Sequence, residues 1–234
     1  MKIKKDLFLV SGGIYGKLGN VCCVKHDHGA ILIDCGSPDS YGTIIENLHY
    51  WGINEKDITH VLLTHGHDDH AGCACDFQKL GARIIIGSGD EEMLKRGDLG
   101  NGSPFNNHVM PPCNADTVIS NDTVMKIDNL TIRIIRTPGH SRGSLVYDIT
   151  SDEGEYLFSG DTFCCEGEKG DIAVTWWKGD ISYNADALGR SLKKLFEADL
   201  HPDVVVGGHN NPRIGSDAVE MIRLAYKYYL LNDR

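Results

Sequence analysis

Residues 60–72 read HVLLTHGHDDHAG, an apolar run followed at once by three histidines and two aspartates within six positions. Such crowding is costly unless the side chains share a ligand. HVLLT (60–64) predicts a buried strand and 71–80 a helix, so the motif lies in the loop at a strand end, where binding residues sit on a rigid scaffold. Imidazoles and carboxylates are good ligands for zinc and related ions. The pattern therefore predicts a metal site.

The same local pattern recurs three times further along the chain. His140 lies in TPGHSRGS after an expected strand at 130–135, Asp161 lies in FSGDT after 156–159, and His209 lies in GGHN after 204–207. Each copy has an apolar β run, then a glycine that allows close backbone approach, then a ligand-type residue. The recurrence favours one shared site at several strand ends.

Length and charge exclude several classes of protein. The chain has 234 residues, 41% of them hydrophobic, which suits one domain over 1–234. A formal charge of −10 without a basic stripe argues against nucleic acid. Leu7–Val10 is too short for the apolar region of a signal peptide, and no run approaches a membrane span. We expect a cytoplasmic protein without membrane association, whose eight cysteines are mostly reduced, small buried residues.

The expected elements follow one plan twice, with strands first and helices later. The expected strands are 7–10, 21–24, 30–34, 60–64, 83–86, 123–127, 130–135, 145–149, 156–159 and 204–207, and the expected helices are 43–51, 71–80, 91–96, 185–197 and 216–231. Residues 97–117, rich in Gly, Asn and Pro, are expected to form a loop. This order predicts two packed sheets with helices outside.

These motifs, together with LIDCG at 32–36, resemble those of the metallo-β-lactamase-fold superfamily of metallohydrolases over nearly the whole chain. The resemblance implies an α/β fold, a four-layer αββα sandwich of two mixed β-sheets flanked by helices. It also implies roles for eight residues: His65, His67 and His140 hold one metal, Asp69, His70 and His209 hold another, Asp161 bridges the two, and Asp34 supports the histidine ligands from behind.

The ligand count agrees with two metal ions, because seven groups exceed the needs of one zinc. Histidine-rich ligation favours Zn²⁺, with iron and manganese as the alternatives. We expect a metal-bridged hydroxide to attack an ester-, thioester-, lactone- or amide-type bond in a small molecule. Asp69 would both ligate a metal and orient the water or accept its proton, as the catalytic residue.

The branch of the family remains open. An aspartate at position 161 is similar to the ligand in glyoxalase II and lactonases, whereas zinc β-lactamases typically have Cys or Ser at this position. In contrast, the stretches FNNHVMPPCNAD (105–116) and TPGHSRGS resemble one β-lactamase subclass. Weak β-lactamase activity is therefore one alternative. A mononuclear-iron oxidoreductase similar to persulfide dioxygenases is a second, and a non-catalytic binding module is a third.

Two stretches are candidates for substrate contact. The glycine-rich loop 11–19 carries Ile14 and Tyr15, and the stretch after Asp161 carries Trp176, Trp177 and Tyr183. Exposed aromatic side chains beside a site favour an apolar or aromatic substrate, whereas packing of a tryptophan in the core is the alternative. His108 lies in the long loop that could reach the site. The sequence leaves the substrate and the oligomeric state open.

Overall fold

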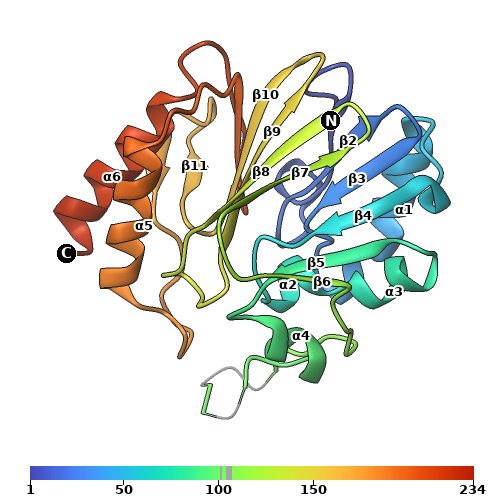
Figure 1. The fold of residues 1–234 in the computed structure, drawn as a ribbon, viewed down its shortest axis with the longest axis horizontal. Helices are drawn as coiled ribbons and strands as arrows, with labels where there is room; N and C mark the ends of the chain where they lie inside the picture. The colour runs from blue at the N-terminus through green and yellow to red at the C-terminus, as the bar shows by residue number, and fades with distance from the viewer. Residues whose placement is uncertain (101, 104–106) are drawn as a thin grey trace.

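The computed structural model describes residues 1–100, 102–103 and 107–234. Two six-stranded sheets lie face to face, with helices on both outer faces (Figure 1). The first sheet has strands in chain order: β1 (Leu7–Ser11), β2 (Val21–His26), β3 (Gly29–Ile33), β4 (Ile58–Leu62), β5 (Arg83–Gly87) and β6 (Thr117–Ile119). β1 to β3 are antiparallel, and β3 to β6 are parallel.

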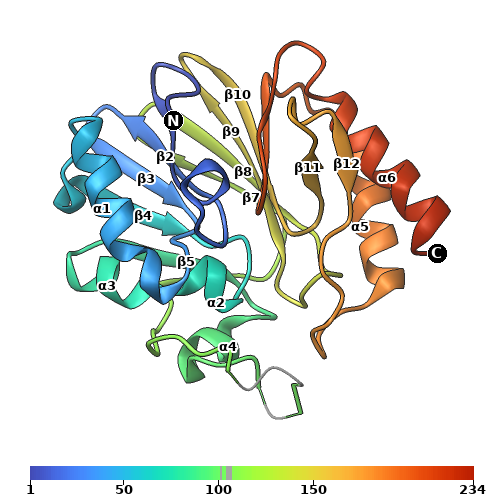
Figure 2. The ribbon, with the colours of Figure 1, turned by 180° about the vertical axis from the view of Figure 1, so that it is seen from behind.

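The second sheet is antiparallel except for one parallel pair of strands. Its order is β14 (Arg213–Ile214), β13 (Val204–Gly207), β10 (Gly154–Gly160), β9 (Leu145–Ser151), β8 (Leu130–Arg136) and β7 (Thr123–Ile127). Only β10 and β13 are parallel neighbours, so their carboxyl ends meet at one edge. A small antiparallel pair, β11 (Cys164–Glu166) and β12 (Ile172–Val174), lies beside β13 and the last helix (Figure 2).

The helices cover the two outer faces (Figures 1 and 2). Those of the first half are α1 (Tyr41–Tyr50), α2 (Asp68–Ala71), α3 (Ala74–Lys79) and α4 (Glu91–Arg96), and those of the second half are α5 (Ala185–Glu197) and α6 (Glu220–Asn232). Short 3-10 turns occupy Gly13–Tyr15, Pro38–Ser40 and Glu55–Asp57. Within the described ranges, no helix is long and apolar enough to cross a membrane.

Alternation along the strands explains the layering. In β1, Leu7 and Leu9 face the core between the sheets, whereas Phe8 and Val10 face the core under α1. Both sets are buried, as expected for a strand covered on its two faces. The αββα arrangement predicted from the sequence is therefore confirmed.

Several predicted boundaries were wrong. The structure has two helices, α2 and α3, where one was expected at 71–80. The helix is interrupted at Gly72, whose amide donates a hydrogen bond to the Gly36 carbonyl at 2.8 Å. A side chain at Gly72 would clash with that carbonyl. The strand expected at 60–64 ends at Leu62, and the last helix begins at Glu220 rather than 216.

Four short strands were not predicted: β6, β11, β12 and β14, each of two or three residues. β6 shortens the loop expected at 97–117. Within that loop, Phe105 and Asn106 of the FNNHVMPPCNAD stretch lie outside the described residues. All eight cysteines are free thiols, and seven are buried, as predicted.

Asp148 is a buried carboxyl in the second sheet whose environment favours its protonated form. It lies on β9, and one of its oxygens, Oδ1, has no hydrogen-bond partner among the described residues. Burial and the negative charge of Glu155 raise the pKa of Asp148 to about 7. The folded state therefore holds a proton there between about pH 4 and 7 that the unfolded chain has lost.

We predict that Asp148 makes the protein less stable as pH rises from about 4 to 7. When the pKa of a group is higher in the folded protein than in the unfolded chain, its contribution to stability is fully present at pH values below the unfolded-state pKa. That contribution is lost as the pH rises through the folded-state pKa. Asp148→Asn should therefore gain stability relative to the wild type between pH 5 and pH 8, by about 1–2 kcal/mol. Urea unfolding of both proteins with chelator present measures the difference. A difference that is independent of pH would contradict the prediction.

Candidate metal centre

Asp34 anchors the loop that carries the first ligand-type residues. It follows β3, and its carboxylate accepts hydrogen bonds from the amide and hydroxyl of Thr64, at 2.7 and 2.8 Å, and from His70 Nδ1 at 2.8 Å. Burial raises the pKa of Asp34, while the bonds from His70 and Thr64 oppose that shift. The φ of Asp34 is 57°, a left-handed conformation that aspartate tolerates better than most residues. One buried carboxylate thus holds both ends of the motif.

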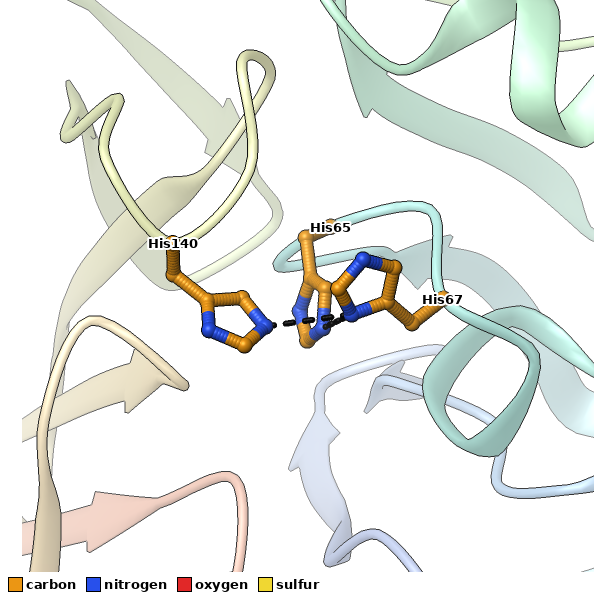
Figure 3. A group of neighbouring side chains, drawn as sticks. All are labelled: His65, His67 and His140. Carbon is orange, nitrogen blue, oxygen red and sulfur yellow. Dashed lines mark hydrogen bonds between the residues drawn. The ribbon is translucent and has the colours of Figure 1, made fainter. Parts of the chain in front are cut away.

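Three histidine rings from the two sheets converge on one point (Figure 3). His65 and His67 come from the loop after β4, and His140 comes from the loop after β8. His67 Nδ1 lies 3.1 Å from His65 Nε2 and 3.1 Å from His140 Nε2. Tetrahedral coordination with metal–nitrogen bonds of about 2.0–2.1 Å separates ligand nitrogens by about 3.3 Å. The spacing fits a metal ion at the centre of the three rings.

The hydrogen-bond network fixes which nitrogens carry hydrogen. Because the Thr64 hydroxyl donates to Asp34, it accepts from His65 Nδ1 at 3.0 Å. The Nε2 atom of His67 donates to the Asp180 carboxylate at 3.1 Å. In neutral rings, the lone pairs of His65 Nε2 and His67 Nδ1 then point toward each other, with no hydrogen between the two nitrogens. A cation that accepts both lone pairs resolves this contact.

A second group lies beside the first. Nε2 of His70 is 3.4 Å from His209 Nε2 and 3.5 Å from Asp69 Oδ2, and His209 Nε2 is 3.4 Å from the same Asp69 oxygen. Asp161 lies between the groups: its Oδ1 is 3.5 Å from His70, and its Oδ2 is 3.5 Å from His140 and 3.3 Å from His209. Asp161 Oδ1 is buried without a hydrogen-bond partner in the described ranges. The seven residues can therefore form two adjoining metal sites.

The electrostatics of the two groups differ. Burial and the neighbouring histidines lower the pKa of His65 well below its usual value, and burial lowers the pKa of His140 to about 3. These rings stay neutral, as ligation requires. Burial also lowers the pKa of His70, but the charges of Asp69, Asp161 and Asp34 outweigh burial and raise it to about 10. The carboxylates thus favour positive charge at this position.

Two carboxylates that hold the ligand loops were not singled out in the sequence. Asp90 is fully buried and accepts hydrogen bonds from the Gly66 amide at 3.0 Å, the Gly143 amide at 2.7 Å and the Ser141 hydroxyl at 2.5 Å, so it ties the loop of His65 to the loop of His140. IIIGSGD (84–90) has the pattern of an apolar run, a glycine and a ligand-type residue that located the other strand ends.

Asp180 had no such signal, because it lies six residues beyond β12. Its Oδ2 accepts from His67 Nε2 and from the Ser182 hydroxyl, and this contact orients His67 so that Nδ1 faces the centre. Burial raises the pKa of Asp180, but the hydrogen bonds from His67 and Ser182 outweigh it and lower the pKa below its usual value. The carboxylate is therefore ionised beside the ring it orients.

A cavity of about 560 Å³ opens above the seven residues. Its floor includes His67, Asp69, Asp161 and His209, and its walls include Trp176 and Trp177, two of the substrate-contact candidates. Trp176 stacks on the ring of His209, with centroids 4.7 Å apart. The aromatic wall therefore touches the candidate centre directly.

The other candidates lie elsewhere. Ile14 lines a neighbouring hollow, Tyr15 packs against the core between the sheets, and Tyr183 packs against the core under α5 and α6. His108 does reach the cavity, where its Nδ1 lies 2.7 Å from Asp68 Oδ1.

We predict that Asp180→Ala weakens zinc binding by about 10- to 100-fold, because His67 loses the acceptor that fixes its ring and tautomer. Asp180→Asn keeps an acceptor oxygen and should lose less. Competition with a fluorescent chelator measures the affinity. Asp199→Ala, at a side chain 93% exposed, is the control and should bind zinc as the wild type does. Equal affinity in a folded Asp180→Ala protein would refute the orienting role.

Comparison with known proteins finds relatives named for a metallo-beta-lactamase domain or as a metallo-hydrolase. The chain is 25% identical over 211 residues to metallo-beta-lactamase domain-containing protein 1 of Xenopus laevis, covering 87% of this chain and 75% of that protein. It is 26% identical to the probable metallo-hydrolase YflN of Bacillus subtilis, covering 90% and 88%. An atrochrysone carboxyl ACP thioesterase of Cryptosporiopsis is 26% identical over 120 residues, which cover 51% of this chain and 31% of that protein.

Solved structures share the fold. The metallo-beta-lactamase GOB-18 of Elizabethkingia meningoseptica superimposes with a TM-score of 0.77 at 23% identity, covering 99% of this chain and 90% of that one. The family model described as the metallo-beta-lactamase superfamily matches residues 15–209, which include all seven ligand-type residues. The chain belongs to the metallo-β-lactamase superfamily.

Proposed function

We propose that the protein is a dinuclear metal hydrolase that cleaves an ester-, thioester-, lactone- or amide-type bond in a small molecule. The observation that carries this proposal is the convergence of imidazole lone pairs and carboxylates on the floor of a 560 Å³ cavity. Such a volume suits a small-molecule ligand. Neither nucleic acid nor a membrane is part of the proposal.

The ligands divide into two sets in this proposal. His65, His67 and His140 hold one ion, and Asp69, His70 and His209 hold the other. Asp161 lies between the sets and contacts both. Two divalent ions held there, with zinc favoured by the imidazoles, would supply the Lewis acidity that lowers the pKa of water and polarises a substrate carbonyl.

The residues of the chain perform the remaining tasks. Asp69 is the ligand carboxylate nearest to solvent, with a side chain 19% exposed against 4% for Asp161, so a water on the cavity floor reaches Asp69 first. Asp69 is placed to orient that water and to accept its proton. Asp34 and Asp180 keep His70 and His67 in the required tautomers.

The names of two relatives support hydrolysis as the reaction class, and one of them supports acyl transfer to water. The YflN protein is named a probable metallo-hydrolase, and the Cryptosporiopsis relative is named a thioesterase. A thioester carbonyl is an electrophile of the kind that Lewis acidity at this floor would activate. Thioesters therefore come first among the substrates to test.

We predict that hydrolysis depends on the metal ions and on Asp69. The purified protein should contain two divalent ions per chain and hydrolyse at least one class among thioesters, lactones, esters and β-lactams. Chelation or His67→Ala should abolish this activity, and Asp69→Asn should reduce kcat by at least about 100-fold. Metal quantification and initial rates measure both, with Asp199→Asn as the exposed control.

Two outcomes would contradict the proposal. Full activity in a metal-depleted variant would remove the metal from the reaction. A single iron with oxygen uptake on a persulfide substrate, and no hydrolysis, would place the protein in a redox branch instead.

A further inference from the structure

The cavity wall carries negative charge and no positive charge away from the metal ligands. Among the described lining residues, Asp68 and Glu166 are the carboxylates outside the proposed centre, and none is Lys or Arg. Asp68 is engaged by His108 at 2.7 Å. The backbone of Glu166 pairs with β12, but its side chain has no hydrogen bond or ion pair with any described residue. One carboxylate on this wall therefore remains unpaired.

Two lysines close to this wall in the sequence are neutralised by carboxylates that do not line the cavity. Lys17 beside Leu18 pairs with Asp39 at 2.9 Å, and Lys178 beside Trp177 pairs with Asp233. Two arginines, Arg96 and Arg142, line a separate hollow on the far side of Leu99. An anionic group on a substrate that lies against this wall would therefore meet a carboxylate and aromatic rings, with no lysine or arginine among the described lining residues to balance it.

Glu166 and Trp176 also form the boundary with a second hollow of about 420 Å³. Its other lining residues include Ile14 and the polar side chains of Asn210 and Asn211. Trp176 stacks on His209, and Cys165, next to Glu166, forms a β-bridge with Asn210, next to His209. The carboxylate and the indole are thus held in fixed relation to the proposed centre.

We propose that Glu166 and Trp176 form a cation subsite, so that the protein prefers acyl substrates whose end remote from the scissile bond carries an amine or quaternary ammonium group. An aromatic face and a carboxylate together attract such a group through the ring quadrupole and through charge. This inference rests on the proposed hydrolase function. The metal-loaded centre would act on the scissile bond, and the subsite would contact only the remote end of the substrate.

Three matched thioesters of phenylacetic acid test the inference. They carry trimethylammonium, tert-butyl or carboxylate at the para position of the ring, and the first two have the same shape. Rates are divided by those of alkaline hydrolysis to remove electronic effects. We expect kcat/KM for the ammonium compound to exceed that for the tert-butyl compound by about 3- to 10-fold. We expect kcat/KM for the carboxylate compound to be at least about 10-fold lower than that for the ammonium compound.

The matched variants are Glu166→Gln and Glu168→Gln. Glu168 lies two residues after Glu166, in the connection that follows β11, is exposed and does not line either hollow. Glu166→Gln should bring the ammonium to tert-butyl ratio close to 1, and Glu168→Gln should leave the wild-type ratio unchanged. A wild-type ratio of 1, a preference for the carboxylate, or a ratio that survives Glu166→Gln would overturn the subsite.

Binding of the corresponding primary amides separates this inference from the proposed function. Isothermal titration calorimetry on the metal-loaded protein should give tighter binding of the ammonium amide than of the tert-butyl amide, with the difference lost in Glu166→Gln. If no thioester is hydrolysed but this difference appears, the subsite stands and thioester hydrolysis fails. If hydrolysis occurs and the amides bind equally, the subsite fails and the hydrolase proposal stands.

Discussion

The structure depends on one unfavourable contact: imidazole lone pairs that face each other at the junction of two sheets. Thr64 and Asp180 occupy the outer nitrogens of His65 and His67, so in the neutral rings that metal ligation requires no hydrogen is left to separate the inner ones. His140 joins them from the other sheet. A cation at this point would turn repulsion into attraction across the interface between the sheets. Metal binding would thus favour the folded state directly.

The protein also holds this junction with its own side chains. Asp90 bonds to backbone amides of both ligand loops, and the Tyr147 hydroxyl on β9 donates to the Leu63 carbonyl, just after β4, at 2.8 Å. Both groups are buried, so their hydrogen bonds are shielded from water. The ligand rings are consequently placed before any ion arrives, which reduces the ordering that binding must impose.

Strand ends were the most predictable part of the molecule. The pattern of an apolar run, a glycine and a ligand-type residue located His140, Asp161 and His209. It did so because buried strands can be predicted from their apolar composition, and the ends of neighbouring strands lie at one edge of the sheet. The same rule applied to residues 84–90 would have found Asp90. The role of Asp180 could not be predicted from the sequence, since its position depends on how an irregular segment folds back after β12. Tyr15 was chosen because it lies in the glycine-rich loop 11–19, and Tyr183 because it follows Asp161 in the sequence. The structure places both against core clusters.

Close backbone approach at the ligand loops has a consequence for how this chain can diverge. A Cβ at Gly208 would lie 2.0 Å from Asp161 Oδ1, and one at Gly19 would lie 2.0 Å from the Asp69 carbonyl oxygen. Substitution at either glycine therefore disturbs a ligand supplied by a different segment. Glu166 is not constrained in this way, because it lines the cavity from the end of β11, outside the loops that carry the ligand residues. Related sequences can therefore differ at Glu166, and so in the substrates that they accept, while they keep the same metal ligands on the cavity floor.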